Sequence, residues 1–185
     1  MNPVKRSMTA AKAVVASIAV MLIAFSFGAA QASEGHSSDD EIGMSGDASE
    51  ATETVHVDMY DNYYEPEELS FQEGQTVRFV ITNKGDAVHE FNIGTAEMHL
   101  AHQPEMEMMV EHGVIDFDRI DHAAAEAMQA SMGHGMHEEP NSVLLEPGQT
   151  AEIVWTFPDH AELEFACNVP GHYGSGMVGE ISLTH

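Results

Sequence analysis

Cysteine is nearly absent from this chain of 185 residues, in which Cys167 is the only one. A lone cysteine forms no intramolecular disulfide, so in an oxidising compartment it bridges to another chain, stays buried or binds a metal. Basic residues are also scarce, with 6 Lys and Arg against 31 Asp and Glu and a formal net charge of −25. This charge repels nucleic acid and anionic membranes and excludes both as natural partners. Cations and basic protein surfaces are the partners that it favours.

Long apolar runs are limited to the N-terminus, where Lys5, Arg6 and Lys12 precede the apolar residues 13–30 and a small-residue Ala-Gln-Ala motif. This order is typical of a secretory signal peptide over residues 1–32, so we predict export to the periplasm. The alternative is a membrane anchor, but the strongly apolar part is short for a transmembrane helix and a polar, acidic segment follows it. We therefore expect no membrane insertion after the signal peptide is cleaved.

The rest of the chain divides into a leader and one domain. Residues 33–52 are rich in Ser, Gly, Asp and Glu, and this composition predicts a flexible acidic leader. Residues 53–185 show short alternating segments bounded by turn residues, which is typical of strands. The predicted strands cover residues 53–59, 67–71, 75–83, 88–93, 142–145, 151–157, 163–167 and 178–183. Eight short strands at this spacing indicate an all-β fold, an antiparallel Greek-key β-sandwich or barrel.

The alternation disappears between residues 95 and 141, which we interpret as a short helical insertion into the sandwich. Pro104 suits the first turn of a helix that ends at Gly113. Asp118 can cap a second helix that runs to Met132. The sequence therefore predicts two short helices between the fourth and fifth strands.

Three residues near the C-terminus carry a metal-binding pattern. Cys167, His172 and Met177 place a thiol, an imidazole and a thioether at five-residue steps. Pro170 and three glycines allow a tight backbone path that returns the last two side chains over the first. Two His, one Cys and a distant Met form the ligand set of a blue-copper electron-transfer centre. A loop rich in Gly and Pro is ordinarily just a turn, but this spacing favours copper and leaves one His to be found.

His89 is the best candidate for that His. It shares one face of a predicted strand with Phe91 and Ile93, which should point into the sandwich. Phe165 and Cys167 likewise share a face, so the thiol would emerge from the core where its strand ends. A core His bonded to a backbone carbonyl is the ordinary alternative, but the downstream Cys, His and Met need one more nitrogen ligand.

These residues resemble the cupredoxin family of small blue-copper proteins, and the resemblance covers residues 53–94 and 142–185. It implies a Greek-key sandwich and electron transfer through His172. The copper ligands that it implies are His89, Cys167, His172 and Met177. The sequence departs from the family at Glu90, where Asn often follows the ligand His, and at Asn168, where Ser or Thr commonly follows the Cys. Hydrogen bonding around the sulfur tunes colour and reduction potential, so both properties depend on these two residues.

Methionine and histidine are concentrated in the insertion, with seven Met and six His among the 40 residues from 98 to 137. A Met-filled core and surface His would explain this density without a metal, and Met106, Met109 and Met128 suit such a core. Beside a copper motif in an acidic exported protein, we favour additional copper binding, with Cu(I) and Cu(II) as the cofactor. The candidate accessory ligands are Met98, His99, His102, Met106, Met108, Met109, His112, His134, Met136 and His137. Residues without an evident partner, expected at the surface, are His36, Met44, His56, His122 and His160.

A signal peptide, one cupredoxin domain and a Met/His-rich insertion are together similar to the periplasmic copper-tolerance cupredoxins of the CopI type. This resemblance implies copper tolerance by binding, and by oxidising or sequestering, Cu(I); cuprous oxidation is the one enzymatic activity considered. The alternative is a dedicated electron carrier that docks through its negative charge on a basic redox protein such as a cytochrome. A multicopper oxidase or a nitrite reductase is disfavoured, since the sequence has no His-x-His pair and no second domain.

Overall fold

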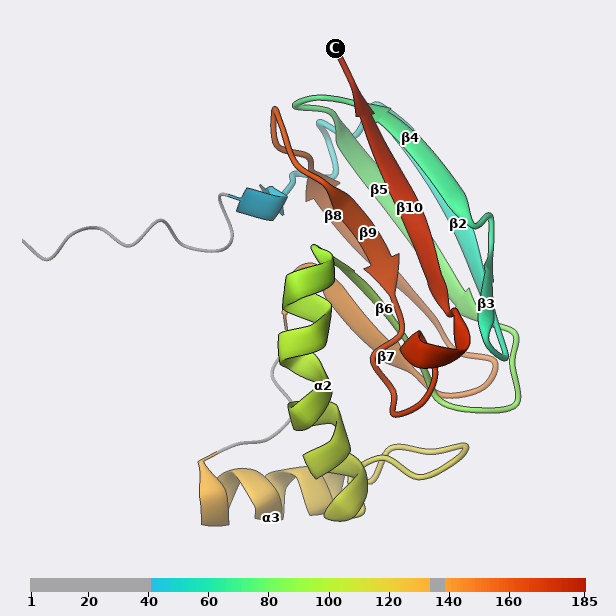
Figure 1. Cartoon of the computed structure of the whole chain (residues 1–185), viewed down its shortest axis with the longest axis vertical. Coiled ribbons are helices and arrows are strands. Elements are labelled where there is room, and N and C mark those ends of the chain that lie inside the picture. The colour runs from blue at the N-terminus through green and yellow to red at the C-terminus, as the bar shows by residue number, and fades with distance from the viewer. Residues whose placement is uncertain (1–40, 134–138) are drawn as a thin grey trace, which may run out of the picture. The chain divides into compact units, whose positions relative to one another are not determined.

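The computed structural model describes residues 41–133 and 139–185, and within them ten strands form two five-stranded sheets (Figure 1). The strands are β1 (Met44–Ser45), β2 (Glu53–Tyr60), β3 (Tyr63–Glu65), β4 (Glu68–Gln72), β5 (Thr76–Asn83), β6 (His89–Gly94), β7 (Ser142–Leu145), β8 (Thr150–Thr156), β9 (Leu163–Ala166) and β10 (Val178–Thr184). The helical elements are α2 (Ala96–Glu111), α3 (His122–Met132) and the 3-10 helix η1 (Tyr173–Ser175). The predicted signal peptide and the residues His36, His134, Met136 and His137 lie outside the described residues.

The two sheets confirm the predicted β-sandwich, although the strand pairing is mixed. One sheet has the order β1-β8-β5-β2-β3 and the other has the order β4-β10-β9-β6-β7. β2 runs parallel to β5, and β4 runs parallel to β10, while the remaining pairs are antiparallel. The expectation of a purely antiparallel sandwich is therefore wrong at these two pairs. Between β2 and β5 the chain passes through β4 of the other sheet, and a parallel pair needs such a crossover connection.

The core lies between the sheets and follows the predicted alternation. Val77, Phe79 and Ile81 of β5 are fully buried, whereas the residues between them are partly exposed. Phe79 meets Phe91 of the opposite sheet with ring centroids 5.6 Å apart. Alternation works because successive strand side chains point to opposite faces, and only one face of β5 meets the other sheet.

The predicted acidic leader is also corrected by the structure over residues 41–52. Residues 41–52 join the sandwich instead of forming the expected flexible segment, because Ile42 is 1% exposed and belongs to the main core. The Trp155 indole Nε1 donates a hydrogen bond to the Ile42 carbonyl oxygen over 3.0 Å. β1 then pairs with β8. Ile42 thus anchors a segment that is otherwise mostly polar. The average composition of residues 33–52 gave no sign of this anchor.

The two predicted helices exist, but both begin elsewhere. α2 starts at Ala96 because the Thr95 side chain accepts a hydrogen bond from Met98 N over 3.2 Å, and Pro104 lies inside the helix instead of in its first turn. α3 is capped by Asp121, whose Oδ1 accepts from Ala124 N over 3.0 Å, and not by Asp118. Among the described residues, no helix is both long and apolar enough to cross a membrane.

The insertion covers the outer face of β6. All six residues of this strand are buried, including the polar Glu90 and Asn92 that alternation would turn toward solvent. α2 runs alongside β6 and β9 (Figure 1), and its His102 Nε2 lies 3.4 Å from Glu90 Oε1. The insertion therefore converts an exposed sheet face into a buried polar layer directly behind His89.

Candidate metal centre

Two adjacent antiparallel strands bring His89 and Cys167 together. His89 is the first residue of β6, and Cys167 directly follows β9, which pairs with β6 through Asn92 and Ala166. His89, Phe91 and Cys167 are each 0% exposed. The predicted inward faces of both strands are therefore confirmed, and the thiol leaves the core beside the imidazole.

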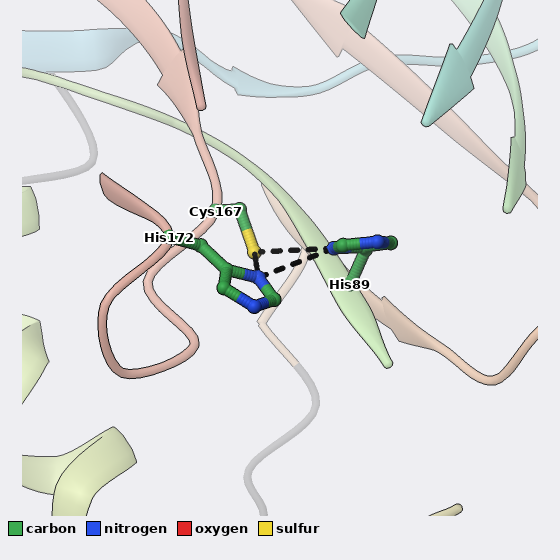
Figure 2. A group of neighbouring side chains, drawn as sticks. All are labelled: His89, Cys167 and His172. Atoms are coloured by element: carbon green, nitrogen blue, oxygen red, sulfur yellow. Dashed lines mark hydrogen bonds between the residues drawn. The ribbon is translucent and has the colours of Figure 1, made fainter. Parts of the chain in front are cut away.

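His172 completes a cluster of three donor atoms (Figure 2). The Nδ1 atoms of His89 and His172 lie 3.2 Å apart. Cys167 Sγ lies 3.3 Å from His172 Nδ1 and 3.9 Å from His89 Nδ1. All three atoms thus face one point, although they come from two strands and a loop separated by up to 83 residues.

The loop from Cys167 to Met177 is closed by its own backbone hydrogen bonds. Cys167 N donates to Met177 O over 3.1 Å, and Met177 N donates to His172 O over 3.0 Å. Gly176 has φ 96°, a left-handed conformation that favours glycine, and it ends η1. Met177 is 0% exposed and belongs to the same buried cluster as Cys167. The turn therefore holds the backbone of the fourth predicted ligand against that of Cys167 and of His172.

Asp61, in the turn between β2 and β3, orients the His89 ring. The His89 Nε2 group donates to Asp61 Oδ1 over 3.0 Å. With the proton on Nε2, the Nδ1 lone pair points at Cys167 and His172, which is the tautomer that a metal requires. The same hydrogen bond lowers the pKa of Asp61. Sequence reasoning missed this residue, since a carboxylate in a surface turn has no distinguishing signal.

Burial keeps the metal-free centre electrically neutral. It raises the pKa of the Cys167 thiol to about 12, although Sγ accepts a hydrogen bond from Glu90 N over 3.3 Å. It also lowers the pKa of His89 and of His172, and the charge on a protonated His89 lowers the pKa of His172 further. A cation that enters must displace the thiol proton but meets imidazoles with free lone pairs.

Glu90 organises the backbone behind the thiol. Its Oε2 accepts hydrogen bonds from Asn168 N over 3.1 Å and from Asn168 Nδ2 over 2.9 Å. Its Oε1 accepts from Ser142 Oγ over 2.9 Å. Burial opposes the ionisation of Glu90, but these donors and His102 together lower its pKa. Because Asn168 follows Cys167 directly, this carboxylate holds the residue that carries the sulfur.

The donor atoms fit a mononuclear copper site. Atoms bound to one ion at about 2.0–2.3 Å in a tetrahedral arrangement lie about 3.3–3.7 Å apart. The three separations of 3.2, 3.3 and 3.9 Å approach that range without any rearrangement of the backbone. One thiol and two imidazoles are also the donors that copper prefers over Mg²⁺ or Ca²⁺.

The candidate accessory ligands are more dispersed. Met106 and Met109 are 1% and 5% exposed and pack with Met128 in a small core of the insertion, as the packing alternative predicted. His99 is buried, and its Nδ1 accepts a hydrogen bond from Asn168 Nδ2 over 3.2 Å. His112 Nδ1 donates to the carbonyl oxygen of Met108 in its own helix over 2.9 Å. These side chains already have structural partners.

One cavity brings three of the candidates together. His102, Met106 and Met109 line a cavity of about 710 Å³ that Glu90 and Glu105 also border. His102 lies 3.3 Å from Glu105 Oε2, and its hydrogen bond with Glu90 raises its pKa to about 9. Met98 instead packs partly buried against the main core.

The predicted surface residues are mostly at the surface. Met44, His56 and His122 are exposed. His160 is exposed too, but it has a partner that the sequence did not reveal, since its Nδ1 donates to Glu73 Oε1 over 2.8 Å.

The sequence and the fold of this chain are similar to those of known proteins. The family model described as a cupredoxin-like domain matches residues 16–112, a range that includes His89 and ends before Cys167. The copper-resistant cuproprotein CopI of Pseudomonas aeruginosa is 42% identical over 171 residues, which cover 85% of this chain and 90% of that protein. The protein of the same name from Rubrivivax gelatinosus is 36% identical over 147 residues, covering 79% of this chain and 75% of that protein.

A solved structure supports the fold independently. Auracyanin B superposes with a TM-score of 0.52 at 18% identity, covering 77% of this chain and 96% of that one. At this identity the likeness concerns the two-sheet architecture alone.

Proposed function

This chain belongs to the cupredoxin family as a CopI-type member that binds copper in copper resistance, and from that premise we propose a type 1 copper centre. The proposed ligands are His89, Cys167, His172 and Met177. The observation that carries the proposal is the convergence of one thiol and two imidazoles on a single buried point. Bound copper supplies one-electron exchange between Cu(I) and Cu(II).

The residues around this point have separate roles in the proposal. Asp61 holds the His89 tautomer, and Glu90 holds both Asn168 and, through its own N–H, the sulfur. The backbone bonds of the loop keep His172 and Met177 over Cys167. A centre held from several sides changes little between the two copper oxidation states, which favours rapid electron exchange.

We place this function in the periplasm, where the protein would bind Cu(I) and oxidise it to Cu(II), the one electron passing through the centre to an external acceptor such as dissolved dioxygen. His172 is the least buried of the three converging ligands and gives the centre its contact with solvent. The cavity lined by His102, Met106 and Met109 is our proposed accessory copper site, because imidazole and thioether groups bind Cu(I). Its residues have packing roles, so we expect this site to bind copper more weakly than the centre.

A second candidate function, electron transfer to a redox partner, is favoured by the surface beside His172. A shallow cavity of about 240 Å³ is lined by His172, Pro170 and the insertion residues Val110 and Phe117. Phe117 is 68% exposed and Val110 is 41% exposed. An apolar surface around His172, the least buried ligand, suits transient docking of a second protein.

The ligand proposal is tested by the absorption spectrum of the purified protein with Cu(II). The wild type should bind one tightly held copper with intense thiolate-to-copper absorption. Cys167→Ser should lose this absorption entirely, whereas His56→Ala, an exposed histidine on β2, should keep it. Intense absorption that persists in Cys167→Ser would show that the sulfur is not a ligand.

The choice between copper tolerance and electron transport needs a functional readout. We expect Cys167→Ser to abolish both cuprous oxidation by the purified protein and copper tolerance of the cells that depend on it. Phe117→Ser should leave copper tolerance unchanged, because it alters only the apolar surface beside His172. Loss of growth on copper in Phe117→Ser, with cuprous oxidation intact, would favour the electron carrier instead.

Copper stoichiometry tests the accessory site. In a titration with Cu(I), the wild type should bind a second copper, and His102→Ala with Met109→Ala should reduce the Cu(I) count to one while the thiolate absorption of the Cu(II) form remains. His112→Ala with Met132→Ala, two changes in the same insertion that do not line the cavity, serve as the control. A wild-type count of one rejects the accessory site and leaves the type 1 proposal intact.

A further inference from the structure

Three residues from distant parts of the chain meet at the end of the sandwich away from Cys167. Glu73 follows β4, His160 lies in the loop between β8 and β9, and His185 follows β10. His160 Nδ1 lies 2.8 Å from Glu73 Oε1, and His185 Nδ1 lies 2.7 Å from Glu73 Oε2. One donor atom from each residue lies within 4.8 Å of the other two. This group is called the distal cluster below.

The sheet framework holds the three segments of the distal cluster in place. β4 and β10 are parallel neighbours in register through Gln72 and Thr184, and Glu73 N donates to Thr184 O over 2.9 Å. Phe157 N donates to Gln75 O over 2.9 Å, which ties the start of the His160 loop to the same turn. The Glu73 side chain is 17% exposed, whereas the two imidazoles are 76% and 81% exposed. The carboxylate of Glu73 is thus held in place and contacts two accessible imidazole rings.

We propose that the distal cluster is a binding site for a borderline divalent cation, Zn²⁺ or Cu²⁺. Two imidazole nitrogens and one carboxylate oxygen are a known ligand set for zinc, with the remaining positions open to water. The same nitrogen and oxygen donors suit Cu²⁺, which such sites bind more tightly than Zn²⁺. No sulfur belongs to the cluster, so it does not select Cu(I) as the thiol and thioether groups elsewhere do.

The electrostatic surroundings support a cation at this place. A second carboxylate, that of Asp159, lies close to the turn that follows Glu73. Its Oδ1 is 3.9 Å from the place where a side chain on the neighbouring Gly74 would begin. The whole chain carries a formal net charge of −25. A negative field of this kind raises the local concentration of cations. The imidazoles already point their Nδ1 atoms at the carboxylate, so binding needs a change of tautomer and a small movement of two exposed rings.

The distal cluster is separate from the proposed copper centre. The seven residues of β10 lie between Met177 and His185, which corresponds to about 23 Å of extended strand. Figure 1 shows the C-terminus at one end of β10 and η1 at the other. Metal binding at the distal cluster can therefore be tested independently of the type 1 centre and of the insertion.

Zn²⁺ alone is the first probe, added to purified protein already loaded with copper and followed by titration calorimetry. We expect one Zn²⁺ per chain, and histidine-ring NMR should show the metal on the Nδ1 atoms of His160 and His185. His160→Ala with His185→Ala should weaken this binding by at least about tenfold, since even groups that only support a metal ligand contribute that much. The thiolate-to-copper absorption should not change.

The matched control replaces two other exposed histidines, His56→Ala with His122→Ala, and should bind Zn²⁺ like the wild type. Both double variants change only exposed rings, so both are expected to fold. Equal Zn²⁺ binding by the two double variants, or wild-type saturation only at millimolar Zn²⁺, would overturn the proposal. The two imidazoles would then serve only as ion-pair partners of Glu73. A repeat with Cu²⁺ should show one Cu²⁺ that adds no thiolate absorption and that is lost in His160→Ala with His185→Ala.

Discussion

The candidate copper centre and the helical insertion contain the same kinds of residue but use them differently. In the centre, His89, Cys167 and His172 direct their donor atoms at one point. In the insertion, Met106 and Met109 fill a core, while His112 bonds to its own helix. An abundance of sulfur and imidazole groups therefore does not by itself make a metal site. A site needs side chains whose free lone pairs converge, and other contacts must fix them there.

The residue that links the two regions should show the largest effect. Glu90→Ala removes a buried carboxylate and leaves Asn168, Ser142 and His102 without their acceptor. We expect the free energy of unfolding to fall by about 3–5 kcal/mol, as for other broken buried ion pairs. Urea denaturation of the metal-free protein measures this loss. The exposed Glu97→Ala, on the helix α2 that also carries His102, should cost less than about 0.5 kcal/mol; equal losses would mean that Glu90 does not join the regions.

The packing role of the insertion methionines predicts the next effect. Met106→Ala should lower the free energy of unfolding by about 2–5 kcal/mol, because it opens a cavity in the small core of the insertion. Met132, which is 45% exposed, provides the control, and Met132→Ala should change stability by less than about 0.5 kcal/mol. Thermal or urea unfolding of both variants decides. A Met106→Ala protein as stable as Met132→Ala would contradict the packing role.

A pH titration of stability tests the contact between α2 and β6. The Glu90 hydrogen bond raises the pKa of His102 to about 9 from its ordinary value of 6.5. A histidine whose pKa is raised by folding stabilises the protein fully below about pH 6.5, and this contribution is lost as the pH rises to about 9. After allowance for the partial exposure of His102, wild type should lose about 1–3 kcal/mol more over this interval than His102→Gln. His56→Gln should titrate like wild type; parallel curves for all three proteins would exclude the linkage.

The smallest expected effect concerns the centre itself. The buried Cys167 thiol has a pKa of about 12, so it is protonated in the metal-free protein and must release its proton to a metal. Copper affinity should therefore rise about tenfold per pH unit between pH 7 and 9, where both imidazoles are neutral. Calorimetry in buffers of different ionisation enthalpy should detect about one proton released per copper. Release of no proton would mean that the thiol is already ionised or is not a ligand.

Much of the sandwich could be predicted because its strands alternate on one buried face. Val77, Phe79 and Ile81 show this regular pattern, and all three lie in the core. The leader was mispredicted because one anchoring residue, Ile42, is hidden in a polar composition. The start of α2 was missed because Thr95 outweighs Pro104 as a start signal, and the helix continues through the proline. Local signals of similar strength compete at helix ends, and tertiary contacts decide between them.

The candidate centre was predictable to a similar degree. The spacing of Cys167 and His172, together with the inward face of His89, selected from sequence three residues whose donor atoms the structure brings together. The role of Met177 as a ligand stays a prediction. Asp61, which orients His89, could not be found in this way because nothing along the chain marks it. The distal cluster was missed for the same reason, since Glu73, His160 and His185 become neighbours only when β4 and β10 pair.

The sequence by itself determined the alternating strands, the short loop that bears a thiol, an imidazole and a thioether, and the excess of negative charge. These properties depend on neighbours in the chain, where the order and size of residues limit the backbone. Only the tertiary structure decided which histidines keep free lone pairs and which are committed to other partners. It did so because donor atoms far apart in the chain meet through strand pairing and burial, and no local pattern encodes either distance or solvent exposure.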